Sequence, residues 1–537
     1  MRHTQIAFDS HFQLGVRSST SKSGRQRYTE MGCNSTSPLI TGHISNCKGR
    51  RIDTMTPRSE SCNASQPEHM ETTTDLPVVS QLEFGNPRTC LVQESPDQPT
   101  FVHCDSTEAF GDDSVDPAQV NRELNLNLGQ KLISPENATL LWILRFLNSI
   151  LISWWERYAF RAWNQIPVAW RRAICRIAWK LYLPLHKALL GRSTGIHRDA
   201  SLEYHAMTTV MWWGRFFPVT VERMRFSLSQ LNIWCREPLL APHVTTIDDD
   251  STLDPKIIPE RQKDFGTVKG LFLHRQSPEE PTEWTILWVY GGAFLSGDTA
   301  GNATKADMVS RQTGMDVFLC EYRLVPEYQA DDIHWDVSLA HQWLCQHKQK
   351  QGGNPQKILL LGVSSGAAAC VRLCQYIAEK QRGETLVPSY TSVAVTKHMP
   401  AGAVLLGPFV DFTEPKGSFV HYPKHDLIVN PRVVETGVPY LDSHLPDRKA
   451  YSPCYRNCRG LPSLCVVVSE HEAVYDMTVA LVNRARADGV PVTVGCWKFM
   501  CHIFSFLDAF IPEGKQSMDF ACAWMRWKRD TDPKRLK

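Results

Sequence analysis

The chain has 537 residues, of which 42% are hydrophobic and 21% are charged, so it is long enough for one large globular domain and additional segments. Its 58 basic and 56 acidic residues give a formal net charge of only +2, so no extended positive field points to a nucleic-acid partner. The 17 cysteines form no CxxC pair and lack the histidine spacing of a zinc site. We therefore expect no nucleic acid, no metal and no other cofactor.

Residues 1–130 are rich in Ser, Thr, Asn, Asp and Pro and contain few aromatic or β-branched runs. Such a composition cannot bury enough apolar surface to offset the entropy of an ordered chain. We therefore expect this N-terminal region to be disordered.

The composition changes at residue 139, where an amphipathic helical segment is predicted that extends to residue 190. Apolar side chains recur at helical spacing from Leu140 to Trp154. Arg145 and Asn148 interrupt this run before it is long enough to span a bilayer comfortably.

Later in this segment, Arg172, Arg176 and Lys180 recur at four-residue intervals beside tryptophan and leucine. Cations next to apolar and aromatic side chains are typical of a helix that lies on a membrane surface. The alternative is a helix that packs on the protein's own core with a solvated basic face. We expect residues 139–190 to contact a membrane, with the endoplasmic reticulum as one candidate location and the cytoplasm as the alternative.

Residues 266–530 alternate short β-rich segments with helical ones, whereas residues 200–265 read as an N-terminal cap and connection. The expected strands are 284–290, 315–322, 357–363, 401–409, 463–469 and 491–497, and the expected helices are 332–350, 366–381 and 474–488. Alternation of strands and helices predicts an α/β domain with a mostly parallel sheet covered on both faces.

One expected strand runs directly into Gly362-Val363-Ser364-Ser365-Gly366 and then into an alanine-rich helix start. This G-x-S-x-G frame between a strand and a helix is typical of a strained turn that exposes a nucleophilic serine. Ser364 is therefore the candidate nucleophile, and Ser365 would contribute a backbone N–H. A turn that merely contains two serines is the alternative.

A serine hydroxyl needs a base to take its proton and a carboxylate to orient that base, in the chain order Ser, acid, His. His502 follows the last expected strand and has apolar flanks. Glu470, Glu472 and Asp476 all follow the preceding strand, so the residues alone leave the acid open.

The stretch Tyr290-Gly291-Gly292-Ala293-Phe294 follows an early strand and precedes the serine. Acyl transfer needs backbone N–H donors where the oxyanion forms, and small residues keep that space open. Gly291, Gly292, Ala293 and Ser365 are therefore the candidate oxyanion hole. An ordinary tight turn is the alternative, and a phosphate loop is disfavoured because no GK[ST] follows.

Together, the motifs of residues 280–510 resemble the hormone-sensitive-lipase-like branch of the α/β-hydrolases. The matching stretches are 290–294 for H-G-G-G-F, 322–327 for Y-R-L-A-P-E, 362–367 for G-D-S-A-G-G, 472–476 for D-P-L-R-D and 502–504 for H-G-F. The resemblance implies an α/β-hydrolase fold with a helical cap, for which residues 200–240 and 412–455 are candidates. It also implies that Glu472 is the acid.

The chain departs from the branch's pattern in that Tyr290 replaces a histidine, Ala293 and Ile503 replace glycines, Val363 replaces an aspartate, and Glu472 replaces an aspartate. None of these changes removes a catalytic atom. The resemblance implies a serine ester hydrolase of the carboxylesterase, lipase or deacetylase type that works through an acyl-enzyme. The aromatic residues of the two candidate cap regions indicate an apolar ester. The alternative is a weakly active or inactive binding or scaffold protein that keeps the fold.

Overall fold

The computed structural model describes a defined set of residues, all of which lie in one compact unit from residue 82 to residue 537. The described residues are 94–95, 98–99, 162, 165–192, 199–212, 220–222, 224–225, 243–251, 253, 266–386, 391–413, 416–421, 426–430, 433–434, 437–440 and 447–531. Within the region expected to be disordered, the structure describes only two short strands, β1 (Glu94–Ser95) and β2 (Gln98–Pro99), which pair antiparallel. The rest of residues 1–130 lies outside the described residues.

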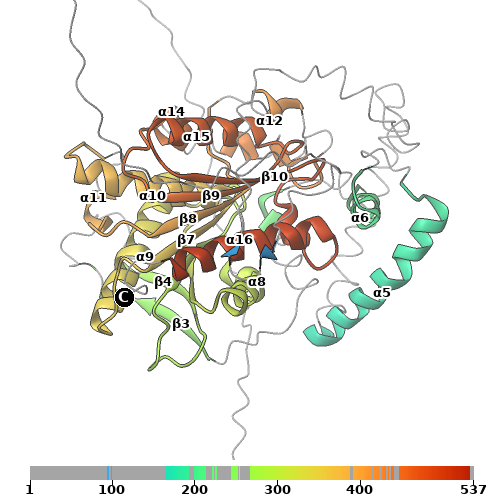
Figure 1. The fold of residues 1–537 in the computed structure, drawn as a ribbon, viewed down its shortest axis with the longest axis horizontal. Helices are drawn as coiled ribbons and strands as arrows, with labels where there is room; N and C mark the ends of the chain where they lie inside the picture. The colour runs from blue at the N-terminus through green and yellow to red at the C-terminus, as the bar shows by residue number, and fades with distance from the viewer. Residues whose placement is uncertain are drawn as a thin grey trace, which may run out of the picture. The chain divides into compact units, whose positions relative to one another are not determined.

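Eight of the described strands form one sheet (Figure 1). In chain order they are β3 (His243–Asp249), β4 (Val268–His274), β5 (Thr285–Val289), β6 (Asp316–Glu321), β7 (Ile358–Val363), β8 (Gly402–Leu406), β9 (Ser463–Ser469) and β10 (Val492–Trp497). Their order across the sheet is β10-β9-β8-β7-β5-β6-β4-β3. The pairs from β10 to β6 are parallel, and all six expected strands are confirmed.

The sheet begins earlier in the chain than expected. β3 lies within residues 200–265, which we expected to be cap and connection, and it pairs antiparallel with β4. β4 in turn pairs antiparallel with β6. β3 is mostly exposed and carries histidine, threonine and aspartate, so it has no apolar alternation by which its sequence would reveal a strand. The central strands β5, β7 and β8, in contrast, are buried at every residue.

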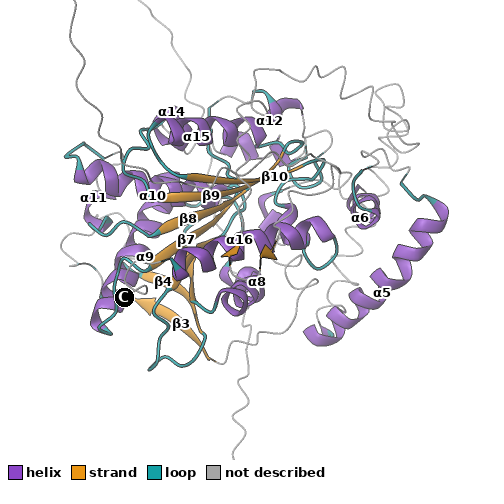
Figure 2. Cartoon of the chain, in the orientation of Figure 1, coloured by secondary structure: helices purple, strands orange, loops and turns teal. Residues whose placement is uncertain are grey.

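Helices cover the sheet as Figure 2 shows. α8 (Thr299–Thr313) packs against α16 (Pro512–Asp530), and α9 (Ala330–Lys350) packs against α10 (Ser365–Gln381). α15 (Tyr475–Ala487) packs against β9 and β10. The helices expected at 332–350, 366–381 and 474–488 are therefore confirmed, within two residues at each end.

Local capping explains where two of these helices begin and end. The Asp298 side chain accepts a hydrogen bond from the Gly301 N–H at the start of α8, and Gly314 ends the helix with a φ of 70°. α9 begins with a reciprocal pair of hydrogen bonds, in which the Gln329 and Asp332 side chains accept each other's backbone N–H.

Before the sheet, the chain forms α5 (Val168–Leu189) and α6 (Leu202–Trp212), which pack against each other. The helix expected within residues 139–190 is confirmed over the span of α5, whereas residues 139–160 lie outside the described residues. Among the helices that the structure describes, none is both long and apolar enough to cross a bilayer. The second candidate cap region, residues 412–455, contains α12 (Ser418–His421), α14 (Arg448–Tyr451) and η6 (Pro453–Tyr455).

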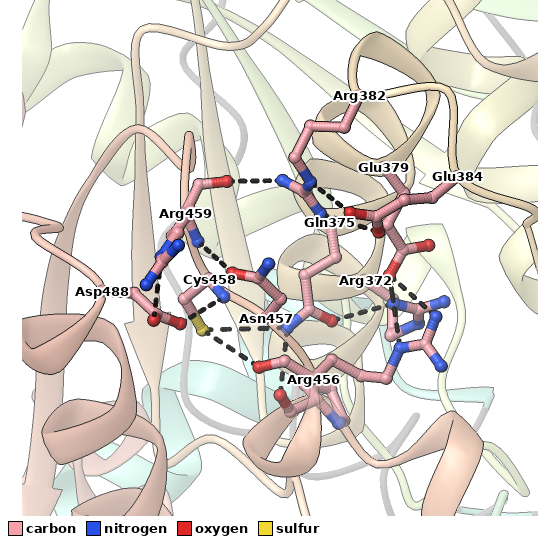
Figure 3. A network of polar contacts seen from close by, with 11 residues as sticks. Arg372, Gln375, Glu379, Arg382, Glu384, Arg456, Asn457, Cys458, Arg459 and Asp488 are labelled. Carbon is pink, nitrogen blue, oxygen red and sulfur yellow. Dashed lines mark hydrogen bonds and ion pairs between the residues drawn. The ribbon is translucent and has the colours of Figure 1, made fainter.

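A buried polar network joins α10 to the segment after η6 (Figure 3). Arg372 donates to the Glu379 carboxylate at 3.1 Å and to the Gln375 side chain at 3.0 Å. Arg456 donates to the same Glu379 oxygen at 2.9 Å. Removal of one partner from such a buried pair leaves an uncompensated charge and costs about 3 to 5 kcal/mol. The network therefore fastens the segment that follows η6 to α10.

Candidate active site

Ser364 lies in a sharp turn between β7 and α10. Its φ and ψ are 52° and −119°, a strained conformation that lifts the side chain above the end of the strand. Two glycines make this turn possible. A Cβ on Gly362 would lie 2.4 Å from the Ala367 Cα, and a Cβ on Gly366 would lie 2.2 Å from the Tyr290 carbonyl oxygen. Strand, turn and helix can pack this closely only because both positions lack a side chain.

The structure brings Ser364, His502 and Glu472 together in one hydrogen-bonded chain. The His502 Nε2 lies 2.8 Å from the Ser364 Oγ, and the His502 Nδ1 lies 2.7 Å from the Glu472 Oε2. All three side chains are buried. They follow β7, β10 and β9, whose carboxyl ends meet at one edge of the parallel sheet, which is where such folds place their ligands.

The structure separates the three carboxylates that follow β9. Only Glu472 reaches the imidazole, and its other oxygen, Oε1, accepts the Ser469 N–H at 2.8 Å. The Asp476 carboxylate instead accepts the Ser418 N–H at 2.7 Å, and the Asp476 N–H donates back to the Ser418 hydroxyl at 3.0 Å. Asp476 therefore fastens α12 to α15, and neither it nor Glu470 is hydrogen-bonded to His502.

The burial of Glu472 affects its protonation. Removal from water raises the pKa of this carboxyl group, because burial penalises the charged form. The hydrogen bonds from His502 and from the Ser469 N–H oppose the rise, and the negative charge of Asp426 adds to it. The net effect is that the pKa of Glu472 lies above its usual value. The side chain that contacts the imidazole is therefore a carboxyl group largely removed from water.

The candidate oxyanion loop follows β5 and carries three successive residues with positive φ: Gly292 at 137°, Ala293 at 55° and Phe294 at 62°. Among the described residues, no acceptor pairs with the backbone N–H of Gly292, Ala293 or Ser365. These N–H groups are available to a negatively charged oxygen. The assignment of Gly291 to the oxyanion hole stays a prediction, and its lack of a side chain is required by the packing, because a Cβ there would lie 2.9 Å from the Ser364 Cβ.

Internal hydrogen bonds hold the shape of this loop. The Gly292 carbonyl accepts the Leu295 N–H at 3.0 Å, the Ser296 N–H at 3.1 Å and the Ser296 hydroxyl at 3.0 Å. The Phe294 N–H donates to the Ser365 hydroxyl at 3.2 Å. The Ser365 side chain therefore ties the loop to the serine turn, a role beyond the backbone N–H that its sequence position suggested.

Tyr290 stands where the resembled branch has a histidine, and it is held by Tyr322. The Tyr322 hydroxyl donates to the Tyr290 carbonyl at 2.6 Å, and the two rings stack with centroids 4.2 Å apart. Burial raises the pKa of both tyrosines well above the usual value, so both hydroxyls stay protonated. This pair supports the start of the oxyanion loop.

The Y-R-L-V-P-E stretch is structural. Arg323 donates to both carboxylate oxygens of Asp336 on α9, at 2.7 and 2.6 Å. Glu327 accepts two hydrogen bonds from Arg225, at 2.8 and 2.6 Å, and Arg225 also donates to the Leu295 carbonyl at 2.7 Å. Through these contacts, Arg225 joins Glu327 to the oxyanion loop.

Sequence reasoning missed two residues that position the triad-like chain. The buried Asp426 carboxylate accepts the backbone N–H of His502 at 2.9 Å and that of Ala473 at 3.3 Å. Gly407 follows β8 and has a φ of 53°, and a Cβ there would lie 3.0 Å from the His502 Cε1. The Gly-Pro pair at positions 407 and 408 is a turn signal that could have drawn attention to Gly407, but no motif marks Asp426.

Comparison with known proteins gives matches that include this site. Residues 286–506 match a family model described as the alpha/beta hydrolase fold. An acetyl-hydrolase of Streptomyces hygroscopicus is 26% identical over 246 residues, which are 45% of this chain and 75% of that protein. An esterase of Acinetobacter venetianus is 28% identical over 239 residues, which are 43% of this chain and 71% of that protein.

One more relative and one solved structure are also similar to this chain. Lipase 2 of a Moraxella species is 34% identical over 243 residues, which are 39% of this chain and 52% of that protein. A solved esterase structure from the bacterial hormone-sensitive lipase family is 24% identical, with a TM-score of 0.49, and the match covers 61% of this chain and 98% of that one. The family match spans the oxyanion loop, the serine turn and both loops that reach the serine, so residues 286–506 of this chain have the alpha/beta hydrolase fold that the matching model describes.

Proposed function

We propose that this chain is a serine hydrolase of carboxylic esters that works through an acyl-enzyme. The observation that carries the proposal is the hydrogen-bonded chain from Ser364 through His502 to Glu472, beside a loop with unpaired N–H groups. These are the parts that acyl transfer needs: a nucleophile, a base, an orienting acid and donors for the oxyanion. The names of the relatives, which are acetyl-hydrolase, esterase and lipase, agree with this reaction class.

In the proposed reaction, Glu472 accepts a hydrogen bond from the protonated Nδ1 of His502, which leaves Nε2 as an acceptor. Nε2 takes the Ser364 proton while Oγ forms a bond to the ester carbon. The carbonyl electrons move to oxygen, and the N–H groups of Gly292, Ala293 and Ser365 receive that charge. The carbonyl then re-forms as the bond between its carbon and the alkoxy oxygen breaks, His502 protonates the leaving alcohol, and an acyl-serine remains. Water attacks the acyl-serine by the same path, which frees the acid and restores the serine.

We propose that the ester is apolar on the side that faces the segment after β8. The Phe409 N–H donates to the Ser364 carbonyl at 3.2 Å, so the backbone of Phe409 lies beside the serine turn. Phe409 packs against Phe412 and Phe419, with ring centroids 5.3 and 5.5 Å apart, and Phe412 packs against Phe294 of the oxyanion loop. An apolar cluster of this kind next to the serine turn favours an acyl chain or ring over a charged substrate.

Covalent labelling tests the proposal. A fluorophosphonate reacts only with an activated serine, so we expect it to label the purified chain and to block hydrolysis of short-chain p-nitrophenyl esters. Ser364→Ala should lose both the label and at least about 10³-fold in kcat, with circular dichroism unchanged. A wild-type chain that is folded but neither labelled nor active would support the alternative of a binding or scaffold protein.

A further inference from the structure

α5 carries an exposed row of large apolar side chains along its whole length. Their exposed fractions range from 42% to 72%, which is far above the values of core residues. We call this row the apolar face of α5, and it consists of Trp170, Ile174, Ile177, Leu181, Leu185 and Leu189. A contiguous apolar surface of this kind is rare on a soluble monomer unless something binds there.

A second side of α5 packs against other parts of the protein. The Trp179 ring packs edge-on against Phe510, with centroids 5.3 Å apart, and the Tyr182 hydroxyl donates to the Ala206 carbonyl of α6 at 3.4 Å. His186 is buried and hydrogen-bonded to the Gly191 carbonyl at 3.1 Å. These contacts set the rotation of the helix about its axis, so the apolar face points away from the hydrolase domain.

The third side of α5 is basic. Arg176, Lys180 and Lys187 are exposed, and at 3.6 residues per turn they lie about 120° from the apolar face. The sequence of α5 contains no aspartate or glutamate. One border of the apolar face is therefore positively charged, and the other is the packed side.

We propose that the apolar face of α5 docks on the surface of an anionic lipid bilayer, with the helix lying in the plane of that surface. The apolar side chains and Trp170 enter the boundary between headgroups and acyl chains, and the lysines meet the phosphates and carboxylates above it. A second copy of the chain is a poorer occupant, because pairing of two such faces would bring two basic borders together. α5 has 22 residues, but it is not apolar enough to be a candidate for a membrane span.

Docking would also position the hydrolase domain. Phe510, which packs on Trp179, follows His502 by eight residues, and the Ser201 N–H and hydroxyl both bind the Glu513 carboxylate at the start of α16. The docked helix therefore packs on the segment that follows the His502 loop and η7 and leads into α16. This inference does not depend on the proposed ester hydrolysis, because membrane binding is measured separately.

Vesicle flotation with the full-length protein tests the proposal. We expect binding to phosphatidylcholine vesicles that contain phosphatidylserine, weaker binding to phosphatidylcholine alone, and partial release at high salt. Ile177→Ser, Leu181→Ser and Leu185→Ser together should lower the partition coefficient at least about tenfold, because apolar area is lost from the interface. Lys180→Gln with Lys187→Gln should lower it roughly fivefold for each lysine, on anionic vesicles only.

Val244→Ser with Val420→Ser is the matched control, since both valines are exposed apolar residues on β3 and α12. This control should bind vesicles as the wild type does. Circular dichroism shows whether the serine variant folds, and the lysine variant provides the test if it does not. Vesicle binding unchanged by the serine substitutions, or a wild type that does not bind anionic vesicles, would overturn the proposal. The proposal would also be overturned if the wild type were a dimer that does not bind vesicles and if the serine substitutions made it a monomer. The apolar face would then be a subunit interface.

Discussion

The Tyr322 hydroxyl donates a hydrogen bond of 2.6 Å to the carbonyl oxygen of Tyr290, the residue that immediately precedes the oxyanion loop. The stacked rings and this bond fix where β5 ends and the loop begins. A strand next to β5 in the sheet, β6, thereby sets the position of the donors that the proposed reaction needs.

Tyr322→Phe removes only that hydroxyl, and it leaves the Tyr290 carbonyl without its donor. We expect kcat for a p-nitrophenyl ester to fall on the order of tenfold while KM stays nearly unchanged, because the displaced N–H groups contact the transition state more closely than the substrate. Steady-state kinetics measure both constants. Tyr328→Phe makes the same chemical change six residues later and should leave kcat as it is; an equal loss in both variants would contradict this reasoning.

Replacement of the three carboxylates after β9 distinguishes their roles. In Glu472→Gln, the amide oxygen can still accept the Ser469 N–H, and the amide NH₂ then faces His502 and favours the tautomer whose Nε2 bears the proton. That tautomer cannot accept the Ser364 proton, so we expect a loss in kcat on the order of 10⁴.

Glu470→Gln should have little effect on kcat. Asp476→Asn should lower the melting temperature and leave kcat nearly unchanged, because Asp476 binds Ser418 and not the imidazole. Measurement of kcat and melting temperature for all three variants decides the question. If Asp476→Asn lost more activity than Glu472→Gln, the assignment of the acid would be wrong.

Gly407 leaves room for the pair of His502 and Glu472. A Cβ at this position would lie 3.0 and 3.1 Å from two atoms of the imidazole and 3.2 Å from the Glu472 Oε2. Gly407→Ala should therefore displace the imidazole and lower kcat by about 10- to 100-fold, in line with the sensitivity of such geometry to small shifts. Gly383→Ala is the matched control, because Gly383 also has a positive φ, of 74°, but a Cβ there would meet no atom within 4 Å. Both variants should lose about 1 kcal/mol of stability from the backbone, whereas only Gly407→Ala should lose activity.

His334 makes the fold sensitive to acid. Its ring is buried among Phe294, Tyr376 and Tyr451, and among the described residues neither ring nitrogen has a hydrogen-bond partner. Burial, with the nearby positive charge of Arg372 as the second cause, lowers the pKa of His334 to about 3. Between that value and the usual pKa of 6.5, the unfolded chain binds a proton that the folded chain does not, so the free energy of unfolding falls as the pH falls.

His334→Met keeps an apolar side chain in this place and removes the titration. Below about pH 6, the variant's free energy of unfolding should decline less steeply than that of the wild type, by up to about 1.4 kcal/mol per pH unit. Urea unfolding at several pH values measures this slope. Val244→Thr, which exchanges two side chains that do not titrate at an exposed position of β3, should leave the slope unchanged, and an equally steep decline in His334→Met would count against the assignment.

The sequence by itself was sufficient to predict those elements that depend on the pattern of neighbouring residues along the chain. The parallel strands β5 to β10 were predictable because each is an apolar run between turn signals, and the Ser364 turn was predictable because its glycines sit at fixed offsets from the serine. β3 was not predictable in this way, since an exposed edge strand needs no apolar alternation. The choice of Glu472 came from resemblance, because three carboxylates follow β9 and local pattern does not rank them.

Only the tertiary structure decided which distant residues meet. Asp426 binds the His502 N–H across 76 positions of sequence, and Gly407 clears space for a histidine from another strand end. The amphipathic pattern of α5 was visible in its sequence, but which side faces the protein depends on Phe510 and α6, which pack on Trp179 and Tyr182. The physical reason is the same in each case: periodicity records which faces of an element are apolar, whereas the partner that covers a face is chosen by the packing of segments far apart in the chain.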